Sequence, residues 1–415
     1  MQNKQLGYAL LVGLSMLSTQ LYAADIAQGK TKSAICAGCH GNNGIGLSDE
    51  FPNLAGQKAP YIIKQLKAFK SGTRKDPTMS AMAAALTESD MANLAAYFSS
   101  LGNAVEKKSN NNAASAQAKA TAHEFPETTF ITMKKSGTVE QFPQEKTWMG
   151  GPNMLYNAVT PDGKKVLATS PSSNTVYVFS ADSGKQLAVI PVGKAPKGVK
   201  VTPDGRFAYI SNQGSANISV VDLDSLQVVD TIAVEEGPHN ARFTRDGSIA
   251  YVTLQGGAGV AVVDTKTRKM IKVIPVPGIT GPHNLDLSAD EKTAFVRDFV
   301  HNVAVLDLGT GKVKKVIKVG NGHGGIDVTP DGKYAATAAI GDNIITLIDT
   351  ETLASNTIEV GNGPHGIRAS KDSQWLYVTL TKDNAVAVIN LKTMQIEKKI
   401  PVGKFPFWVA VRGNS

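Results

Sequence analysis

The tetrapeptide Thr160-Pro161-Asp162-Gly163 decides the fold of most of this 415-residue chain, because the sequence repeats it. Related tetrapeptides begin at six positions: Thr160, Thr202, Thr244, Ser288, Thr329 and Ser370. The intervals between these positions are 42, 42, 44, 41 and 41 residues. A regular period of about 40–45 residues is typical of a β-propeller, in which every repeat supplies one blade of four strands.

One repeat unit shows how four strands follow each other along the chain. We predict them at four segments: 196–201, 206–211, 217–222 and 227–234. β-Branched and aromatic residues alternate along these segments, as in strands that pack on a core. The Asp and Gly of each tetrapeptide suit the backbone angles of the tight turn that joins the first strand to the second.

The two ends of the repeat region are predicted to share a blade. Six full units run from about Met149 to Ile400, and the tail 405–411 repeats the first strand of a unit before it stops. The segment 130–142 can supply outer strands for that same blade. Joining the ends would close the ring and cover both sheet edges. We therefore predict an all-β, seven-bladed propeller over residues 129–415.

A second motif lies near the N-terminus, at Cys36-Ala37-Gly38-Cys39-His40. The pattern C-x-x-C-H is the sequence mark of covalent c-type haem attachment. Cys36 and Cys39, about one helical turn apart, can each form a thioether to the porphyrin, and His40 is then the proximal iron ligand. A thioredoxin-like pair would follow a strand, and a zinc site would need further Cys or His residues before His123. The sequence has neither a strand pattern before the motif nor further Cys or His residues before His123, so we predict one covalent haem c.

A second axial ligand is expected downstream of the motif. Met79 and Met82 are the candidates, and a thioether ligand raises the haem potential and suits electron transfer. The segment 87–90 resembles a capping box, which begins a helix. Leu94, Tyr97, Phe98 and Leu101 would share one face of that helix. The pattern predicts a small all-α domain with a methionine loop between its helices.

Residues 24–103 resemble a class I cytochrome c of the kind found in bacterial di-haem cytochromes c. The likeness is carried by Phe51-Pro52-Asn53-Leu54-Ala55-Gly56-Gln57, by the segment 61–66 and by Leu94-Ala95-Ala96-Tyr97-Phe98. In that family the first methionine of M-x-x-M is usually the ligand, so the resemblance implies Met79, with Met82 as the alternative. It also implies that Pro52 supports the proximal histidine.

The remaining segments indicate export and a tether. Residues 1–23 read as a signal peptide, with Lys4 before an apolar run that is short for a membrane span and a cleavage site near Ala23. We therefore expect a periplasmic protein without stable membrane insertion. Residues 104–128 are polar and alanine-rich, which predicts a flexible linker. The net charge is +8, but the basic residues are scattered, so no nucleic-acid partner is expected.

Histidines recur at the start of the first strand in four consecutive units: His239, His283, His323 and His365. The first strand of a blade lies at the axial channel, so these side chains should meet at one end of it, with His301 in a turn on the same face. Imidazole clusters suit copper, iron or zinc. The alternative is that a copied histidine only hydrogen-bonds strand ends around a water-filled channel. His323 is also one residue out of step with the other three.

One blade departs from its sisters near these histidines. Arg297 and Asp298 stand where sister blades carry Thr253-Leu254 or Ser211-Asn212. A guanidinium near an axial opening could hold an anionic substrate, and Asp298 could orient that substrate or a histidine. We predict both as substrate-binding residues.

Residues 150–412 resemble the YVTN family of propeller repeats through Tyr209-Ile210-Ser211-Asn212 and Tyr251-Val252-Thr253-Leu254. The domain order resembles haem-c/haem-d nitrite reductase, whose axial histidines serve a second haem. Copper enzymes such as nitrous oxide reductase and thiocyanate dehydrogenase also collect histidines at a propeller axis. These likenesses imply copper or a second haem in the propeller.

Three functions fit these observations. The first is a cytochrome c-linked oxidoreductase that acts on a small substrate and exchanges electrons with a partner cytochrome or copper protein. The second is a non-enzymatic electron-transfer or docking protein, and the third is a carrier or insertion factor for a tetrapyrrole such as haem. A hydrolase is disfavoured, because the chain has no G-x-S-x-G motif and a hydrolase would not need a haem.

Overall fold

The computed structural model describes residues 24–41, 44–45, 51–113, 127–257 and 259–414. The chain divides into two compact units, residues 1–121 and 122–415, and each is described by itself. The predicted signal peptide and residues 114–126 of the predicted linker lie outside the described residues. Within the described part, no helix combines the length and apolar character needed to cross a membrane.

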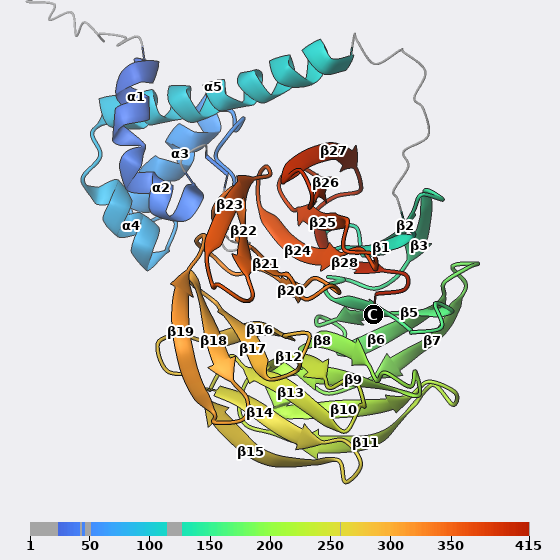
Figure 1. Cartoon of the computed structure of the whole chain (residues 1–415). Coiled ribbons are helices and arrows are strands. Elements are labelled where there is room, and N and C mark those ends of the chain that lie inside the picture. The colour runs from blue at the N-terminus through green and yellow to red at the C-terminus, as the bar shows by residue number, and fades with distance from the viewer. Residues whose placement is uncertain (1–23, 42–43, 46–50, 114–126, 258, 415) are drawn as a thin grey trace, which may run out of the picture. The chain divides into compact units, whose positions relative to one another are not determined.

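The N-terminal unit is helical, as predicted (Figure 1). Its helices are α1 (Ile26–Lys32), α2 (Ala34–His40), α3 (Ala59–Lys70), α4 (Pro77–Ala84) and α5 (Glu88–Ala113). Asp25 caps α1, since its carboxylate accepts from the backbone N–H of Ala27 at 2.8 Å. Helices α1 and α5 cross closely at Gly29, where an added Cβ would lie 2.0 Å from the carbonyl oxygen of Asn93. Only glycine allows that approach.

One boundary and one element differ from the sequence prediction. Helix α5 continues to Ala113, so residues 104–113 are helical, whereas a linker was predicted from 104. The first half of this stretch contains Ala, Glu and Lys, which have high helix propensity, whereas Ser109 and the asparagines at 110–112 do not, so propensity explains only the start of the extension. The methionine segment is also a short helix, α4, where a loop was predicted. Asp76 caps it by accepting from the backbone N–H of Met79 at 2.8 Å.

The second unit consists of seven four-stranded antiparallel sheets, which confirms the predicted seven-bladed propeller (Figure 1). The first four blades in chain order are β4 (Asn157–Val159), β5 (Lys165–Ser170), β6 (Thr175–Ser180), β7 (Gln186–Pro191); β8 (Pro196–Val201), β9 (Phe207–Asn212), β10 (Asn217–Asp222), β11 (Gln227–Ala233); β12 (Pro238–Phe243), β13 (Ile249–Leu254), β14 (Gly259–Asp264), β15 (Lys269–Pro275); and β16 (Pro282–Leu287), β17 (Thr293–Asp298), β18 (Asn302–Asp307), β19 (Lys312–Lys318). A short 3₁₀ helix, Gln213–Ser215, follows β9.

The last three blades complete the ring. They are β20 (Ile326–Val328), β21 (Tyr334–Ala338), β22 (Ile344–Asp349), β23 (Ser355–Glu359); β24 (Pro364–Ala369), β25 (Trp375–Leu380), β26 (Ala385–Asn390), β27 (Gln395–Pro401); and the composite blade β28 (Pro406–Val411), β1 (Thr129–Met133), β2 (Thr138–Phe142), β3 (Lys146–Met149). In the composite blade β28 pairs with β1, with Phe130 opposite Ala410. The predicted closure by the two ends is therefore confirmed.

The repeated tetrapeptide builds the same turn in successive blades. In the first, Asp162 accepts from the Thr160 hydroxyl at 2.6 Å and from the Lys164 backbone N–H at 3.0 Å. Gly163 adopts φ +70°, a left-handed conformation that favours glycine. These bonds hold the entry to the second strand, and this is the local reason why the motif recurs.

The first strands of consecutive blades contact one another around the ring, and β28 contacts β4 to complete it. Buried aliphatic and aromatic side chains fill the space between neighbouring sheets in several clusters. Exposed residues concentrate on the outermost strands such as β11 and β15. The ring of first strands therefore places residues from seven distant parts of the sequence around one axis.

Candidate functional site

The haem-binding motif lies at the end of helix α2. His40 is 4% exposed, and its ring Nδ1 lies 2.8 Å from the carbonyl oxygen of Pro52, to which it can donate. That bond leaves Nε2 without a proton, and Nε2 is buried with no hydrogen-bond partner. A carbonyl that fixes the tautomer of a ligating histidine is a common feature of metal sites. His40 therefore fits an iron ligand, and Pro52 supports it through its backbone oxygen.

The remaining haem residues lie around the same helical core. Cys36 is partly buried and packs against the core cluster that contains Leu94 and Phe98, while the Cys39 side chain lies outside the described part. Met79 packs against this same cluster, whereas Met82 is 45% exposed. The structure thus places Met79 at the core that Cys36 borders, and Met79 as the second axial ligand stays a prediction.

Four propeller histidines form one continuous cluster, which we call the histidine cluster: His239, His283, His323 and His365. Ring centroids of neighbouring members lie 3.9, 4.9 and 5.1 Å apart in that order. His239, His283 and His365 are at most 2% exposed, and His323 is partly buried. The structure therefore brings together four residues that the sequence separates by more than 120 positions.

Three members of the cluster can offer nitrogen atoms to one metal ion. Ligand atoms of His283, His323 and His365 all lie within 4.8 Å of one another. Nδ1 of His365 donates to the carbonyl oxygen of Phe407 at 3.0 Å, which leaves Nε2 buried and unpartnered. Both ring nitrogens of His283 are also buried without partners. Unpaired buried polar atoms are costly, so a ligand for these nitrogens is a natural explanation.

The electrostatics of the cluster keep its imidazoles neutral. Burial lowers the pKa of His283 and His365 well below 6.5, and neighbouring histidines add to the shift. Burial also lowers the pKa of His239, with Lys197 as a further cause. For His323, burial and then Arg297 lower the pKa to about 4. A neutral imidazole is the form that binds a metal, so no proton competes at neutral pH.

Aromatic residues complete the surroundings of the cluster. The Tyr156 hydroxyl lies 3.3 Å from Nε2 of His239, and Phe407 lies beside His365 with ring centroids 4.0 Å apart. Phe299 stacks on His323 at 4.6 Å with an interplanar angle of 4°. The sequence analysis missed Tyr156 and Phe299. Counting back from the Thr160 turn places Leu155 level with His239, and that count could have pointed to its neighbour Tyr156.

Arg297 and Asp298 are fully buried, which corrects the prediction that they contact substrate. The Arg297 guanidinium donates to the Asp298 carboxylate at 2.8 Å and to the carbonyl oxygen of Gly320 at 2.9 Å, and it also bonds the carbonyl oxygen of Gly322. With 0% exposure and both Nη atoms engaged, Arg297 holds the backbone just before His323 and cannot meet a solvent-borne substrate.

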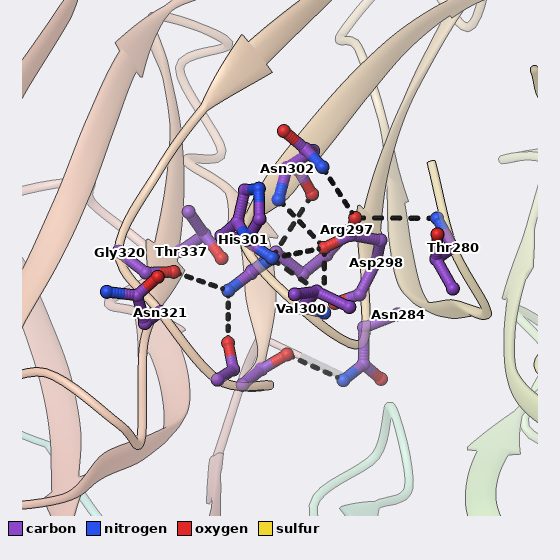
Figure 2. Close-up of polar contacts among 12 residues, drawn as sticks. Thr280, Asn284, Arg297, Asp298, Val300, His301, Asn302, Gly320, Asn321 and Thr337 are labelled. Atoms are coloured by element: carbon purple, nitrogen blue, oxygen red, sulfur yellow. Dashed lines mark hydrogen bonds and ion pairs between the residues drawn. The ribbon is translucent and has the colours of Figure 1, made fainter. Parts of the chain in front are cut away.

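Asp298 organises the turn between β17 and β18 (Figure 2). Its Oδ1 accepts from the backbone N–H groups of Val300, His301 and Asn302 at 2.9, 2.7 and 2.7 Å. This turn carries Phe299, which stacks on His323. His301 lies in the same turn, but among the described residues its ring is not one of the three metal-competent ones and makes no ring contact with the cluster. His301 as a ligand therefore stays a prediction that this geometry does not favour.

Known proteins resemble the two units separately. The family model for cytochrome c matches residues 26–102. Cytochrome c-554(548) of Halomonas halodenitrificans is 43% identical over 81 residues, which are 19% of this chain and 98% of that protein. The chain belongs to the cytochrome c family. It is also 38% identical over 92 residues to cytochrome c4 of Pseudomonas aeruginosa, covering 22% of this chain and 46% of that one. The chain thus spans about half the length of the cytochrome c4 that it matches.

Membership of the family gives this cytochrome a covalent haem c, and its attachment at Cys36 and Cys39 with His40 on the iron stays a prediction. Its propeller matches the family model of the cytochrome D1 haem domain over residues 149–288. The solved dihydro-haem d1 dehydrogenase NirN, in complex with DHE, aligns over 93% of this chain and 99% of its own at TM-score 0.54 and 16% identity. Hydrazine synthase of Kuenenia stuttgartiensis aligns over 63% and 90% at TM-score 0.57 and 22% identity. These structures support the fold, and the domain order is the one predicted from nitrite reductase.

Proposed function

We propose that this cytochrome is a periplasmic oxidoreductase whose propeller holds a redox-active transition metal on His283, His323 and His365. The observation that carries the proposal is the convergence of their ring nitrogens within 4.8 Å. Imidazole suits copper, iron, nickel and zinc, and copper(II) has the highest affinity of the divalent first-row series. Zinc has no redox chemistry and would not use a haem partner, so copper is preferred. The substrate is a small molecule that this metal oxidises or reduces.

Each part of the chain has a distinct task in this proposal. Haem c, when bound, supplies one-electron transfer at the potential set by His40 and its second axial ligand. The histidine cluster stays neutral and holds the metal, while Arg297 fixes the backbone of Gly320 and Gly322 and so the approach of His323. Phe299 shields one face of His323 and is itself 43% exposed, so it borders the side from which substrate arrives.

A second candidate is the binding of a tetrapyrrole at the same face, either as a second haem or as cargo for transfer to another protein. The match of residues 149–288 to the cytochrome D1 haem domain favours it. A macrocycle needs one axial histidine and an apolar surface. Phe299 and Val300, 43% and 39% exposed, offer such a surface beside the cluster. Four histidines in ring contact exceed that need, and for this reason we place the metal centre first.

Electrons must also leave or enter through another protein. We propose a small periplasmic cytochrome or copper protein as the partner. The basis is the family: one similar protein, 43% identical over 70 residues, is the thiosulfate dehydrogenase electron acceptor of Stutzerimonas stutzeri. Pure electron transfer without a substrate is the remaining alternative, and it predicts no metal beyond the haem iron.

Metal analysis and an optical spectrum of the exported, haem-loaded protein test these proposals together. We expect one copper per chain besides one haem iron, with the copper lost in His365→Ala and retained in the matched control His301→Ala. The haem spectrum should be unchanged in both variants. One iron and no other metal, with only the spectrum of haem c, would contradict the metal centre. Absorption beyond haem c without copper would establish the tetrapyrrole instead.

A further inference from the structure

A layer of charged side chains lies deeper in the propeller than the histidine cluster. Each member stands two residues before the Thr or Ser of its turn, or at the matching place in β28, and pairs with the second strand of its own blade. We call it the charged layer. It has seven positions, five of which carry a charged side chain: Ala158, Lys200, Arg242, Asp286, Asp327, Arg368 and Ala410. It follows His239, His283 and His365 by three residues, about 10 Å along a strand.

Four of these side chains form ion pairs across neighbouring blades. Arg242 lies 2.8 Å from Asp286 and 3.7 Å from Asp327. Arg368 donates to Asp327 at 2.6 Å. Each carboxylate accepts in addition from a backbone N–H, Asp286 from Val328 at 2.9 Å and Asp327 from Ala369 at 2.7 Å. Both carboxylates are therefore fully engaged with the two guanidiniums and the backbone.

Lys200 is left over from this pairing. It is 9% exposed, and its ammonium has no hydrogen-bond or ion-pair partner among the residues that the structure describes. Burial, and then the like charges of Arg242 and Arg368, lower the pKa of Lys200 well below its usual value, while Asp286 and Asp327 act to raise it. Three cations against two carboxylates leave one positive charge in excess. An unpaired buried charge is costly, so the excess calls for either a neutral lysine or a bound anion.

Further donors of the layer are also unused. Nε of Arg368 is buried and lacks a hydrogen-bond partner, and Nη2 of Arg242, 3.7 Å from Asp327, is buried and makes no hydrogen bond. In the ring, Lys200 and Arg368 each have one neighbouring layer position outside the ion pairs, and these positions are Ala158 and Ala410. No long side chain therefore fills that part of the layer. The side chains of Arg242, Asp286 and Arg368 keep 6%, 14% and 8% exposure. A water-sized molecule can therefore touch these side chains at this depth.

We propose that the charged layer binds one small inorganic anion of single charge, held by Lys200 together with Arg242 and Arg368. The anion neutralises the excess charge, and guanidinium N–H groups and an ammonium supply the donors that such an anion requires. Halides, nitrite and nitrate share this chemistry. The anion site uses no residue of the histidine cluster, so anion binding can be tested independently of whether the propeller binds a metal.

Crystals of the whole protein grown with sodium bromide and without chloride give a direct test. We expect an anomalous bromide peak in the charged layer, within about 3.5 Å of Nζ of Lys200, as for a charge-assisted contact. Replacing bromide with nitrite should put planar density at the same place. A water molecule or nothing in the layer at high bromide concentration would overturn the proposal.

Thermal unfolding supplies a second measurement in solution. Titrating bromide in place of gluconate, which is too large for the site, should raise the Tm of the propeller by about 2 °C or more, since ligands stabilise the state they bind. Lys200→Met should lose this response, while the matched control Lys164→Met, at a lysine whose side chain is 76% exposed, should keep it. An equal response in Lys200→Met and the wild type, or no response in the wild type, would refute the anion site. Should Lys200→Met fail to fold, the bromide peak decides.

Discussion

At the scale of single residues, the haem-binding motif and the histidine cluster share one feature. In His40 and in His365 the ring Nδ1 donates to a backbone carbonyl oxygen, of Pro52 and of Phe407 respectively, and Nε2 remains buried and unpartnered. The carbonyl fixes the tautomer, so each imidazole presents a lone pair in a set direction. In His40 that direction suits the haem iron that we predict it binds, and the same geometry is the strongest reason to expect a ligand at His365.

The axial methionine can be assigned with a matched pair of variants. Met79→Ala should remove the methionine-to-iron charge-transfer band of the oxidised protein. It should lower the haem potential by on the order of 100 mV, within the roughly 0.8 V that axial ligands span. Met82→Ala is the control and should leave both unchanged, since Met82 is 45% exposed. Optical titration of potential measures this, and the reverse pattern would assign Met82.

Arg297 should matter for stability as well as for the histidine cluster. Arg297→Met removes the partner of Asp298, a carboxylate with 0% exposure, and deletes the bonds to Gly320 and Gly322. We expect a loss of about 3–5 kcal/mol in the free energy of unfolding, as for breaking a buried ion pair. Urea unfolding measures it. Arg206→Met, at a side chain 65% exposed, is the control and should cost under about 1 kcal/mol. A similar small loss in both would show that the pair is not needed.

At the scale of elements, the blades depend on aspartates that close the turn after the first strand. Asp246 accepts from the Thr244 hydroxyl at 2.6 Å and from the Ser248 backbone N–H at 3.0 Å. Asp290 makes the same pair of bonds with Ser288 and Lys292 at 2.6 and 3.1 Å. These bonds favour the ionised carboxylate, and the bond from the hydroxyl has the largest effect. They lower the pKa of both aspartates below 3.8.

The lowered pKa values predict how stability depends on acid. Because the folded pKa lies below the unfolded one, the stabilising contribution is fully present above about pH 4 and is lost as pH falls through the folded pKa. The urea midpoint should therefore drop steeply below pH 4. Asp246→Asn with Asp290→Asn should lower the midpoint at pH 7 and flatten its fall in acid. An unchanged acid dependence in this double variant would exclude the turns as its cause.

At the scale of the whole propeller, ring closure rests on one strand. β28 pairs with β1 and contacts β24 and β4 as well, and its Trp408, Val409 and Val411 are at most 3% exposed. Without it, β1 would become an open edge of its sheet and the core between this blade and its neighbours would lose its filling side chains. The first strands could then not maintain the arrangement that aligns the histidine cluster.

Deleting residues 404–415 should therefore destabilise the propeller by on the order of 5 kcal/mol or more, given about 1.5–3 kcal/mol for each large apolar side chain that is no longer buried. Calorimetry of the truncated protein should show a lower Tm for the propeller while the haem spectrum remains. A synthetic peptide of residues 404–415, added in excess, should recover part of the Tm. An unshifted Tm in the truncated protein would contradict closure by β28.

The sequence by itself determined the haem motif, the helical domain, the period of the blades and the joining of the two ends. These depend on local chemistry: spacing of Cys36 and Cys39 on one helix, and a turn that each Thr-x-Asp segment makes with its own backbone. It also identified the four histidines and their order from blade to blade. What it could not determine were relations between blades, where no local pattern exists. Burial of Arg297, the insertion of Tyr156 and Phe299 at the cluster, and the unequal charges around Lys200 arise only when seven first strands meet at one axis. There the low dielectric and the lack of water decide which polar groups must be paired.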